Sequence, residues 1–483
     1  MVNHNNPRNE PFSYFHSTTG PDQRREPHWI RRGIGALLLV LIVGCAFDSA
    51  YALQGATGIH DPSSIIKRNG VYHVWGTGNQ IYHLTSTDLI RWTVAPTVFA
   101  AGQWPSWINT YVPGFGGFFW APECIYLNGR YYLYYSCSTG GRPSAIGLVT
   151  STDLVNWTDQ GMVVFSDNVT RYGSIDASVF QDANSNLWFV FGSHLDGIWM
   201  AQLNPTTGKR LNSTLVNVAR VTDAEAAYVV RHNGFYYLFY NRGICCNGVN
   251  STYYMQMGRS ANPNGPYLDR NGNSLSNSTG STFLATSGRY VGPGHAGSFA
   301  ENGVEYLTYH FYDRNANGAP TLRVGNLRWD SAGWPYASAD WIANGRYRIT
   351  NRGNGLVWDD WGCTGGSLEA IAQGSYWGGL CQLWDFVSLG NGAYRIASAQ
   401  GGLSADVLNC SSAAGAKLDL YSYWGGSCQQ FNLERAADGS YVISSVNGNR
   451  VVDVPNATTT TGTQLQLWDY NGSTAQRWLI GPP

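Results

Sequence analysis

The C-terminal third of the chain is a threefold repeat with a period of 47 residues. Segments 371–384, 418–431 and 465–478 align without gaps, as IAQGSYWGGLCQLW, LDLYSYWGGSCQQF and LQLWDYNGSTAQRW. Three copies of 47 residues account for 141, which fills the chain from about 342 to residue 483. A repeat of this kind predicts similar structural units that stack and share one core.

A looser motif recurs five times between about 53 and 341, as a tight turn followed by a strand rich in aromatic residues. These strands are predicted to begin at 71, 130, 187, 235 and 304. Asn-Gly precedes four of the five, and Asn-Gly before an alternating strand is a strong hairpin signal. Units of about 58 residues are long enough for a four-stranded blade. We therefore expect a five-bladed β-propeller with one funnel on its axis.

Composition narrows the class of partner. The chain holds 30 basic and 31 acidic residues, a net charge of −1, so a nucleic-acid partner is not expected. Glycine (58 of 483 residues) and aromatic residues (14%) are both abundant, which favours short strands and many turns.

Residues 1–52 have the pattern of an export signal. Arginines between 24 and 32 precede an apolar run at 34–44, and a small-residue cleavage pattern ends at Ala52. Alternatives are a lipoprotein box that leaves Cys45 lipidated, or an uncleaved anchor. All three place the remainder outside the cytoplasm, where disulfides persist. We expect a secreted monomer, or a lipid-anchored one, with no other membrane association.

Three acidic residues stand in apolar, turn-flanked stretches about ten residues before an aromatic strand: Asp61, Asp176 and Glu225. Burying a carboxylate is costly, so this shared register predicts that all three lie on innermost strands and converge on the axis. Glu123 has a similar register. Glycosidic cleavage needs one protonated and one ionised carboxyl group, and a third acid nearby raises the pKa of the proton donor.

The three copies of the repeat end in Gln-x-Trp, weakened to Gln-x-Phe in copy two. This resembles the ricin-type β-trefoil lectins, or carbohydrate-binding module family 13. The resemblance implies that Gln-x-Trp packs in the core and that polar residues contact sugar, here Asp359, Asp406, Asp453 and Asn471. Copies one and two carry Trp377 and Trp424 where copy three has Asn471. The equal spacing of 18 residues predicts the disulfides Cys363–Cys381 and Cys410–Cys428.

The segments GIHDPSSI, FFWAPE, SAIGLVTS, GSIDASV and EAAYVV resemble the five-bladed hydrolases of glycoside hydrolase family 43. Cys245-Cys246 and the Ser-Thr-Tyr that follows at 251–253 resemble its endo-acting arabinanases in particular. The resemblance implies that Asp61 is the general base and Glu225 the general acid. Asp176 would orient Glu225 and keep its pKa high. The family inverts the anomeric configuration.

Further roles follow from the same resemblance. His295 matches a histidine that holds a hydrated cation, usually calcium, at the centre of the funnel, although the ion is not required for the bond-breaking step. Substrate contacts are expected from Trp120, Gly173, Ser174, Ile175, Ser193 and His194. Arabinanases usually carry Ser-Phe-Trp where this chain has Ser193-His194-Leu195. Cys245 and Cys246 are either a vicinal disulfide or two thiols.

The sequence therefore predicts an all-β protein, with an export segment at 1–52, a five-bladed β-propeller at 53–341 and a β-trefoil at 342–483. The predicted activity is inverting endo-hydrolysis of α-1,5-linked arabinan, a side chain of plant pectin. An exo-α-L-arabinofuranosidase or β-xylosidase of the same fold is an alternative, and so is a sugar-binding protein without catalysis.

Overall fold

The computed structural model describes residues 53–338, 340–390 and 392–483. The export segment predicted for 1–52 lies outside these residues. The described chain is all-β apart from short 3₁₀ turns and one α-helix, α1 (Trp107–Tyr111). No helix within the described ranges is long and apolar enough to cross a membrane.

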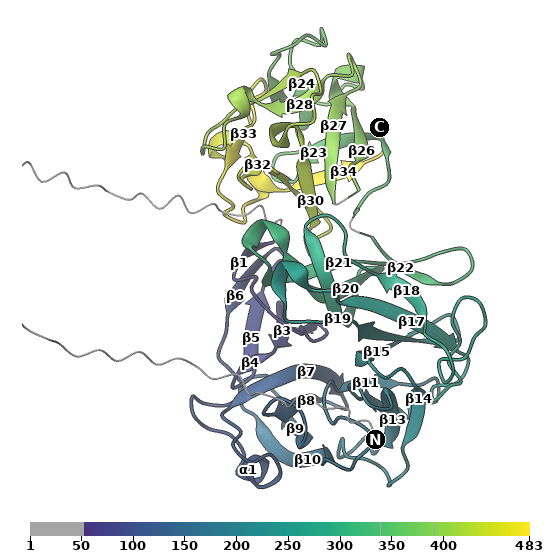
Figure 1. Ribbon diagram of the computed structural model, residues 1–483. Helices are drawn as coiled ribbons and strands as arrows, with labels where there is room; N and C mark the ends of the chain where they lie inside the picture. The colour runs from purple at the N-terminus through teal and green to yellow at the C-terminus, as the bar shows by residue number, and fades with distance from the viewer. Residues whose placement is uncertain (1–52, 339, 391) are drawn as a thin grey trace, which may run out of the picture. The chain divides into compact units, whose positions relative to one another are not determined.

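The first part of the chain forms five sheets, which are the blades of a propeller (Figure 1). Blade one contains β1 (Gln54–Gly55), β2 (Ile66–Arg68), β3 (Val71–Gly76), β5 (Tyr82–Ser86) and β6 (Arg91–Val94). Blade two contains β4 (Gly78–Asn79), β7 (Phe118–Leu127), β8 (Arg130–Ser138), β9 (Ser144–Ser151) and β10 (Thr158–Ser166). Blade three contains β11 (Ser178–Gln181), β12 (Leu187–Phe191), β13 (Ile198–Leu203) and β14 (Val216–Ala219). Blade four contains β15 (Glu225–His232), β16 (Phe235–Arg242), β17 (Tyr254–Ser260) and β18 (Ser281–Leu284). Blade five contains β19 (Tyr290–Glu301), β20 (Val304–Asp313), β21 (Ala319–Trp329) and β22 (Pro335–Ser338).

The five aromatic strands predicted from the sequence are β3, β8, β12, β16 and β20, and each begins at the predicted residue. Each follows the inner strand with which it pairs, which is β2, β7, β11, β15 or β19, and in blade two the two-residue β4 pairs with the other edge of β7. Four hydrophobic clusters lie between successive blades, so aromatic side chains from central strands, such as Tyr134 and Tyr237, fill the gaps between sheets. The propeller is therefore held together mainly by apolar packing between blades.

The ring is closed by the segment just before the first blade's inner strand. Gly58 forms a bridge with Thr321 in β21 of blade five. Two backbone hydrogen bonds flank it, from Ile59 N to Pro320 O at 3.2 Å and from Leu322 N to Thr57 O at 2.8 Å. This pairing ties the first blade to the last and fixes the start of the segment that carries Asp61.

The C-terminal part is a single sheet of twelve strands, the trefoil. Its strands are β23 (Gly345–Asn351), β24 (Val357–Asp360), β25 (Ile371–Gly374), β26 (Trp384–Ser388), β27 (Ala393–Ser398), β28 (Ser404–Val407), β29 (Leu418–Tyr421), β30 (Phe431–Arg435), β31 (Tyr441–Ser445), β32 (Val451–Asp453), β33 (Gln466–Trp468) and β34 (Trp478–Gly481). Trp384 and Trp478 are fully buried, and each packs edge-to-face against Trp358. The ring centroids are 5.5 Å apart in the first pair and 5.6 Å apart in the second.

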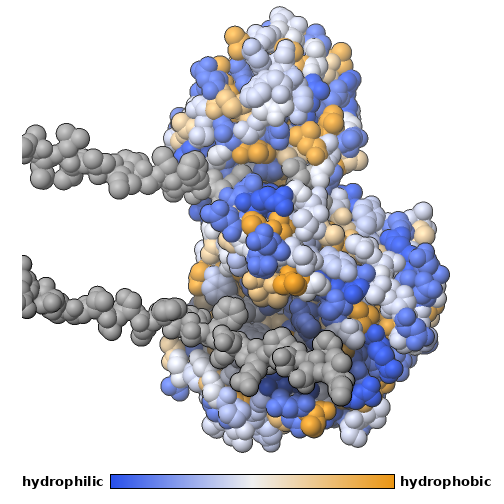
Figure 2. Space-filling model, in the orientation of Figure 1, coloured by the Kyte–Doolittle hydropathy of each residue, from blue (hydrophilic) through white to orange (hydrophobic). Residues whose placement is uncertain are grey.

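The predicted disulfides Cys363–Cys381 and Cys410–Cys428 are both present. The glutamine of each Gln-x-Trp motif is buried, as the resemblance implied. Trp377 and Trp424, by contrast, are 66% and 62% exposed. On the face shown in Figure 2, apolar residues are scattered among polar ones.

Candidate active site

Every blade has one non-glycine residue with a left-handed backbone on or just before its innermost strand. These residues are Asp61, Ala121, Asp176, Ala226 and His295, with φ between 41° and 61°. A left-handed residue interrupts strand pairing and turns a side chain or an amide group out of the ladder. Asp61 and Asp176 therefore lie just before β2 and β11 rather than within them, which corrects the predicted placement, while Glu225 is the first residue of β15.

The amide groups of these left-handed residues are bound by side chains from the preceding blade. The partner comes six residues after the start of a central strand, in four pairs: Ala121 N to Thr77 Oγ1 (2.9 Å), Asp176 N to Ser136 Oγ (3.0 Å), His295 N to Asn241 Oδ1 (2.9 Å) and Asp61 N to His310 Nδ1 (3.1 Å). The same position in blade three is Ser193. Ser193 instead donates from Oγ to Glu225 Oε2 at 2.9 Å.

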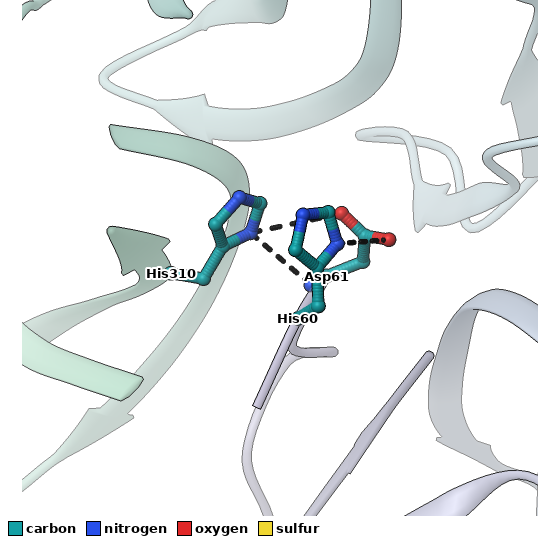
Figure 3. A group of neighbouring side chains, drawn as sticks. All are labelled: His60, Asp61 and His310. Atoms are coloured by element: carbon teal, nitrogen blue, oxygen red, sulfur yellow. Dashed lines mark hydrogen bonds and ion pairs between the residues drawn. The ribbon is translucent and has the colours of Figure 1, made fainter. Parts of the chain in front are cut away.

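Asp61 lies among three imidazoles. His60 Nδ1 is 2.8 Å from Asp61 Oδ2, and Thr77 Oγ1 donates to the same oxygen at 2.6 Å. His310 Nδ1 contacts both the amide and the carboxylate of Asp61 (Figure 3). Burial alone would raise the pKa of Asp61, but His60, with His295 and His310, holds it well below its usual range. The carboxylate is therefore ionised.

His60 has the opposite behaviour. Burial lowers its pKa, but the Asp61 carboxylate outweighs burial and raises the pKa to about 10. His60 Nε2 also contacts Tyr312 Oη at 2.7 Å, so both ring nitrogens are engaged. His60 and Asp61 thus form a partly buried ion pair, and the contacts among His60, Asp61 and His310 are those of an ion-pair and hydrogen-bond network rather than of a metal centre.

Glu225 and Asp176 form the second part of the site. Asp176 Oδ2 accepts a 2.9 Å hydrogen bond from the amide of Ala226, the residue after Glu225. Burial raises the pKa of Asp176 well above its usual range, and Glu225 and Asp61 raise it further. Burial also raises the pKa of Glu225, while Tyr253, His194 and Ser193 oppose this shift. Burial therefore favours the protonated form of both carboxyl groups in this pair, whereas the neighbouring histidines favour the ionised form of Asp61.

The three acids line one pocket of about 800 Å³, the catalytic pocket, together with Trp120, Ile175, Tyr253 and other residues. A second pocket of about 420 Å³, the side pocket, is lined by Arg142, Gly173, Ser193, His194 and others. Trp120, Ile175 and Glu225 line both. Glu225 therefore borders both pockets.

Five of the six residues predicted to contact substrate line a pocket, and the sixth does not. Trp120, Gly173, Ile175, Ser193 and His194 each line a pocket. Ser174 does not fit its predicted role, because it is fully buried and its amide already donates to Ser144 and Ser166. A side chain on Gly173 would meet the carbonyl oxygen of Ser193 at 2.9 Å, so this close approach requires glycine. Glu123 is buried away from the pocket linings given above, and its carboxylate accepts from Ser64 N at 2.9 Å.

His295 is buried beside the base, with Nδ1 3.7 Å from Asp61 Oδ1. Its Nδ1 has no hydrogen-bond partner. The flanking glycines are explained by packing, since a Cβ on Gly294 would lie 2.2 Å from the ring of Tyr253. A buried, unsatisfied imidazole nitrogen next to a carboxylate fits a hydrated cation, because water molecules could complete the coordination.

In the trefoil, copy three has the fullest set of candidate sugar contacts. Asp453, Gln466, Trp468 and Asn471 line a pocket of about 420 Å³, and Gln466 Nε2 donates to Asp453 Oδ2 at 2.9 Å. Copy two has Asp419 in place of Gln466, and its carboxylate lies against Asp406, so burial and this neighbour raise the pKa of Asp419 to about 7. Asp359 in copy one is bound by Gln382 Nε2 at 2.7 Å, and Gly374 stands where Trp468 would be.

Sequence reasoning missed four residues of the catalytic pocket and its surroundings: His60, Tyr253, His310 and Tyr312. The position of His310 was available from the sequence, because it lies six residues after the start of its central strand, as Thr77 and Ser136 do. His60 is adjacent to Asp61 in the sequence, but adjacency alone did not reveal that their side chains pair.

A model for glycosyl hydrolases family 43 matches residues 56–335 of the chain. The chain belongs to glycoside hydrolase family 43. A ricin-type beta-trefoil lectin domain-like model matches residues 326–421 and 427–482. The five blades and the twelve-stranded sheet correspond to these two matches.

Curated relatives of this family 43 member include enzymes with two modes of action. An extracellular endo-alpha-(1->5)-L-arabinanase of Bacillus subtilis is 38% identical over 312 residues, which is 62% of this chain and 94% of the relative. An extracellular exo-alpha-(1->5)-L-arabinofuranosidase of Cellvibrio japonicus is 32% identical over 331 residues, 64% of this chain and 92% of the relative. The solved family 43 endo-arabinanase of Bacillus licheniformis superposes with a TM-score of 0.56 at 36% identity, covering 59% of this chain and 99% of that one.

Proposed function

We propose that the protein is an extracellular, inverting endo-α-1,5-L-arabinanase. The observation that carries the endo assignment is that the catalytic and side pockets share Trp120, Ile175 and Glu225 in their linings, so that Glu225 borders both. A polysaccharide chain that runs through both places an internal bond at the acid, whereas exo action requires a pocket closed at one end. The similarity to the Bacillus subtilis endo-arabinanase supports the same substrate class.

The charge states support the assignment of roles. Asp61 is ionised and acts as the general base on water. Glu225, with a raised pKa, is the general acid that protonates the leaving oxygen. Asp176 orients Glu225 through the backbone of the next residue rather than by direct contact. Inversion requires the two reacting carboxyl groups to be roughly 6.5–9.5 Å apart, to leave room for the water.

We further propose that His295 holds a hydrated cation, and that this cation is calcium, whose preference for oxygen ligands is met by its water molecules. The unsatisfied Nδ1 of His295 supports this site. When bound, the ion would supply positive charge beside the base. Proton transfer itself is performed by Asp61 and Glu225.

The trefoil is proposed to keep the enzyme on plant polysaccharide through copy three. Trp468 is 42% exposed and offers a ring for a sugar to stack on, and Asp453 and Asn471 supply polar contacts in the same pocket. The enzyme is proposed to act as a monomer, with arabinan side chains of pectin as substrate.

The product profile on linear, debranched α-1,5-arabinan tests this function. Endo action produces a ladder of mixed oligosaccharides at early times, as seen by anion-exchange chromatography, and Glu225→Gln protein should produce it at least about a hundredfold more slowly. The second candidate is exo action, which the Cellvibrio japonicus relative favours. Arabinose or one short product from the first time point would establish exo action, and release of xylose from aryl xylosides would indicate a xylosidase. If the protein bound sugar but hydrolysed neither arabinan nor aryl xylosides, it would be a lectin.

A further inference from the structure

Cys245 and Cys246 are neighbours in the chain, and both line the catalytic pocket beside Asp61 and Glu225. Their Sγ atoms are 2.8 Å apart, and the two thiols are not joined in this structure. Unbonded carbon atoms pack best at about 3.5–4.0 Å, and sulfur is larger than carbon, so the two sulfur atoms are pressed together.

The loop between β16 and β17 holds the pair in place. Cys246 N donates to Tyr312 Oη at 2.6 Å, and Ile244 N donates to Thr252 Oγ1 at 3.0 Å. Ser251 Oγ donates to Ile244 O at 2.8 Å. Cys246 itself has a left-handed backbone, with φ of 59°. These contacts direct both sulfur atoms into the pocket, where Cys246 Sγ is 3.7 Å from His60 Nε2.

Among the residues that the structure describes, Cys245 and Cys246 are each the only cysteine placed to form a disulfide with the other. Cys124 and Cys137 are buried in β7 and β8, in the cluster between blades one and two. The remaining four described cysteines form the two trefoil disulfides. Two accessible thiols side by side are oxidised readily in an extracellular medium.

We propose that Cys245 and Cys246 are joined as a vicinal disulfide in the exported protein, and that this disulfide is part of the wall on which a substrate sugar rests. The two thiols lose two protons and two electrons, and a protein or small-molecule disulfide takes them up and becomes two thiols. One S–S bond forms and one breaks. The role as a substrate wall rests on the proposed function, whereas the disulfide itself does not.

Oxidation changes the chemistry of the wall. A disulfide sulfur is uncharged and a weak acceptor, so Tyr312 Oη remains the acceptor for the Nε2–H of protonated His60, and the ion pair between His60 and Asp61 stays intact. The joined sulfur atoms present a polarisable, apolar surface to the C–H face of a sugar. Reduction restores two polar, mobile thiols at that position.

Mass spectrometry of the full, secreted chain tests the bond. The protein is denatured and alkylated with iodoacetamide before and after reduction, and then digested. Before reduction, we expect the peptide with Cys245 and Cys246 to be unlabelled and lighter than its dithiol by two hydrogen atoms. Cys124 and Cys137 serve as internal free thiols, and the trefoil cysteines as internal disulfides. Labelling of both Cys245 and Cys246 before reduction would overturn the proposal.

Kinetics on arabino-oligosaccharides test the wall. A mild reductant is added until mass spectrometry shows that the Cys245–Cys246 disulfide is reduced. KM should then rise about tenfold, which is the effect expected from the loss of one apolar contact, and kcat should change less. The same rise is expected in a control lacking a trefoil disulfide, C410S/C428S, and no further rise in C245S/C246S. An unchanged KM after complete reduction would rule out the wall. Absence of hydrolysis in every form, with the disulfide intact by mass, would instead refute the proposed function.

Discussion

The hydroxyl group of Ser193 donates a hydrogen bond of 2.9 Å to Glu225 Oε2. In the other four blades, the residue at this position accepts a hydrogen bond from the amide of a left-handed residue in the next blade. In blade four that amide belongs to Ala226, and Asp176 binds it instead. A structural contact repeated around the ring is thus replaced, at one position, by two contacts that orient the acid.

Ser193→Ala should lower kcat about tenfold and move the alkaline limb of the pH profile to higher pH. The hydroxyl group lowers the pKa of Glu225, so its removal lets Glu225 keep its proton to higher pH, while the carboxyl group loses an orienting contact. Ser193→Thr retains the hydroxyl and should recover most of kcat. The measurement is kcat against pH for all three proteins. An unmoved alkaline limb in the alanine variant would mean that Ser193 only fills space.

Glu225→Gln and Asp61→Asn should differ in how much their kcat depends on the leaving group of the substrate. Loss of a general acid lowers kcat by about 10²–10⁴ on natural substrate, but little on an aryl arabinoside whose phenol leaves without protonation. Loss of the base lowers both, because water still has to be activated. Steady-state rates on arabinan and on a nitrophenyl arabinoside compare them, with thermal melts as the check on folding. Equal losses on the two substrates for Glu225→Gln would contradict its role as acid.

His60→Gln should move the acid limb of the kcat/KM profile to higher pH. The folded site holds the pKa of Asp61 below its usual range, so the base stays ionised as pH falls. Removing the imidazolium raises that pKa, and Asp61 is then protonated at a higher pH. A soluble arabino-oligosaccharide is the suitable substrate, because trefoil binding does not contribute. His83→Gln is a control histidine on β5, outside the pocket, and should leave the limb in place.

Trp468→Ala should weaken retention on insoluble arabinan or pectin without changing kcat on soluble oligosaccharides. Loss of one stacking platform costs about 0.5–1.5 kcal/mol beyond buried area, so the dissociation constant should rise several-fold. Trp377→Ala is the matched control, since Trp377 is more exposed but lies outside the copy-three pocket. Depletion assays on washed polysaccharide measure both. If Trp377→Ala weakened binding and Trp468→Ala did not, the sugar site would belong to copy one.

The propeller was predictable because its signal is local. Turn residues followed by aromatic alternation located the start of all five central strands, and the 47-residue period located the trefoil copies. The acids were found because a carboxyl group in an apolar stretch is unusual in any one blade. Their convergence in one pocket follows from the shared register.

The rest of the site depended on contacts between distant residues. His310 and Tyr312 come from blade five but act on Asp61 and His60, about 250 positions earlier in the chain. The position of His310 in its central strand was available from the repeat, but nothing in the sequence showed that this histidine of blade five meets Asp61 of blade one. Ser174 failed for the reverse reason, because the sequence showed its closeness to Asp176 but not that Ser144 and Ser166 already occupy its amide.

The closure of the ring through Gly58 and Thr321 also sets the order in which the enzyme can become competent. Asp61 follows that closure by three residues, and its amide is bound by His310 from the last blade to be synthesised. The contacts of the acid half of the site come from earlier in the chain, since Ser193 and Asp176 in blade three bind Glu225 and the residue after it. A chain released before blade five is made therefore lacks both the histidine that binds the amide of Asp61 and the strand that pairs beside Gly58.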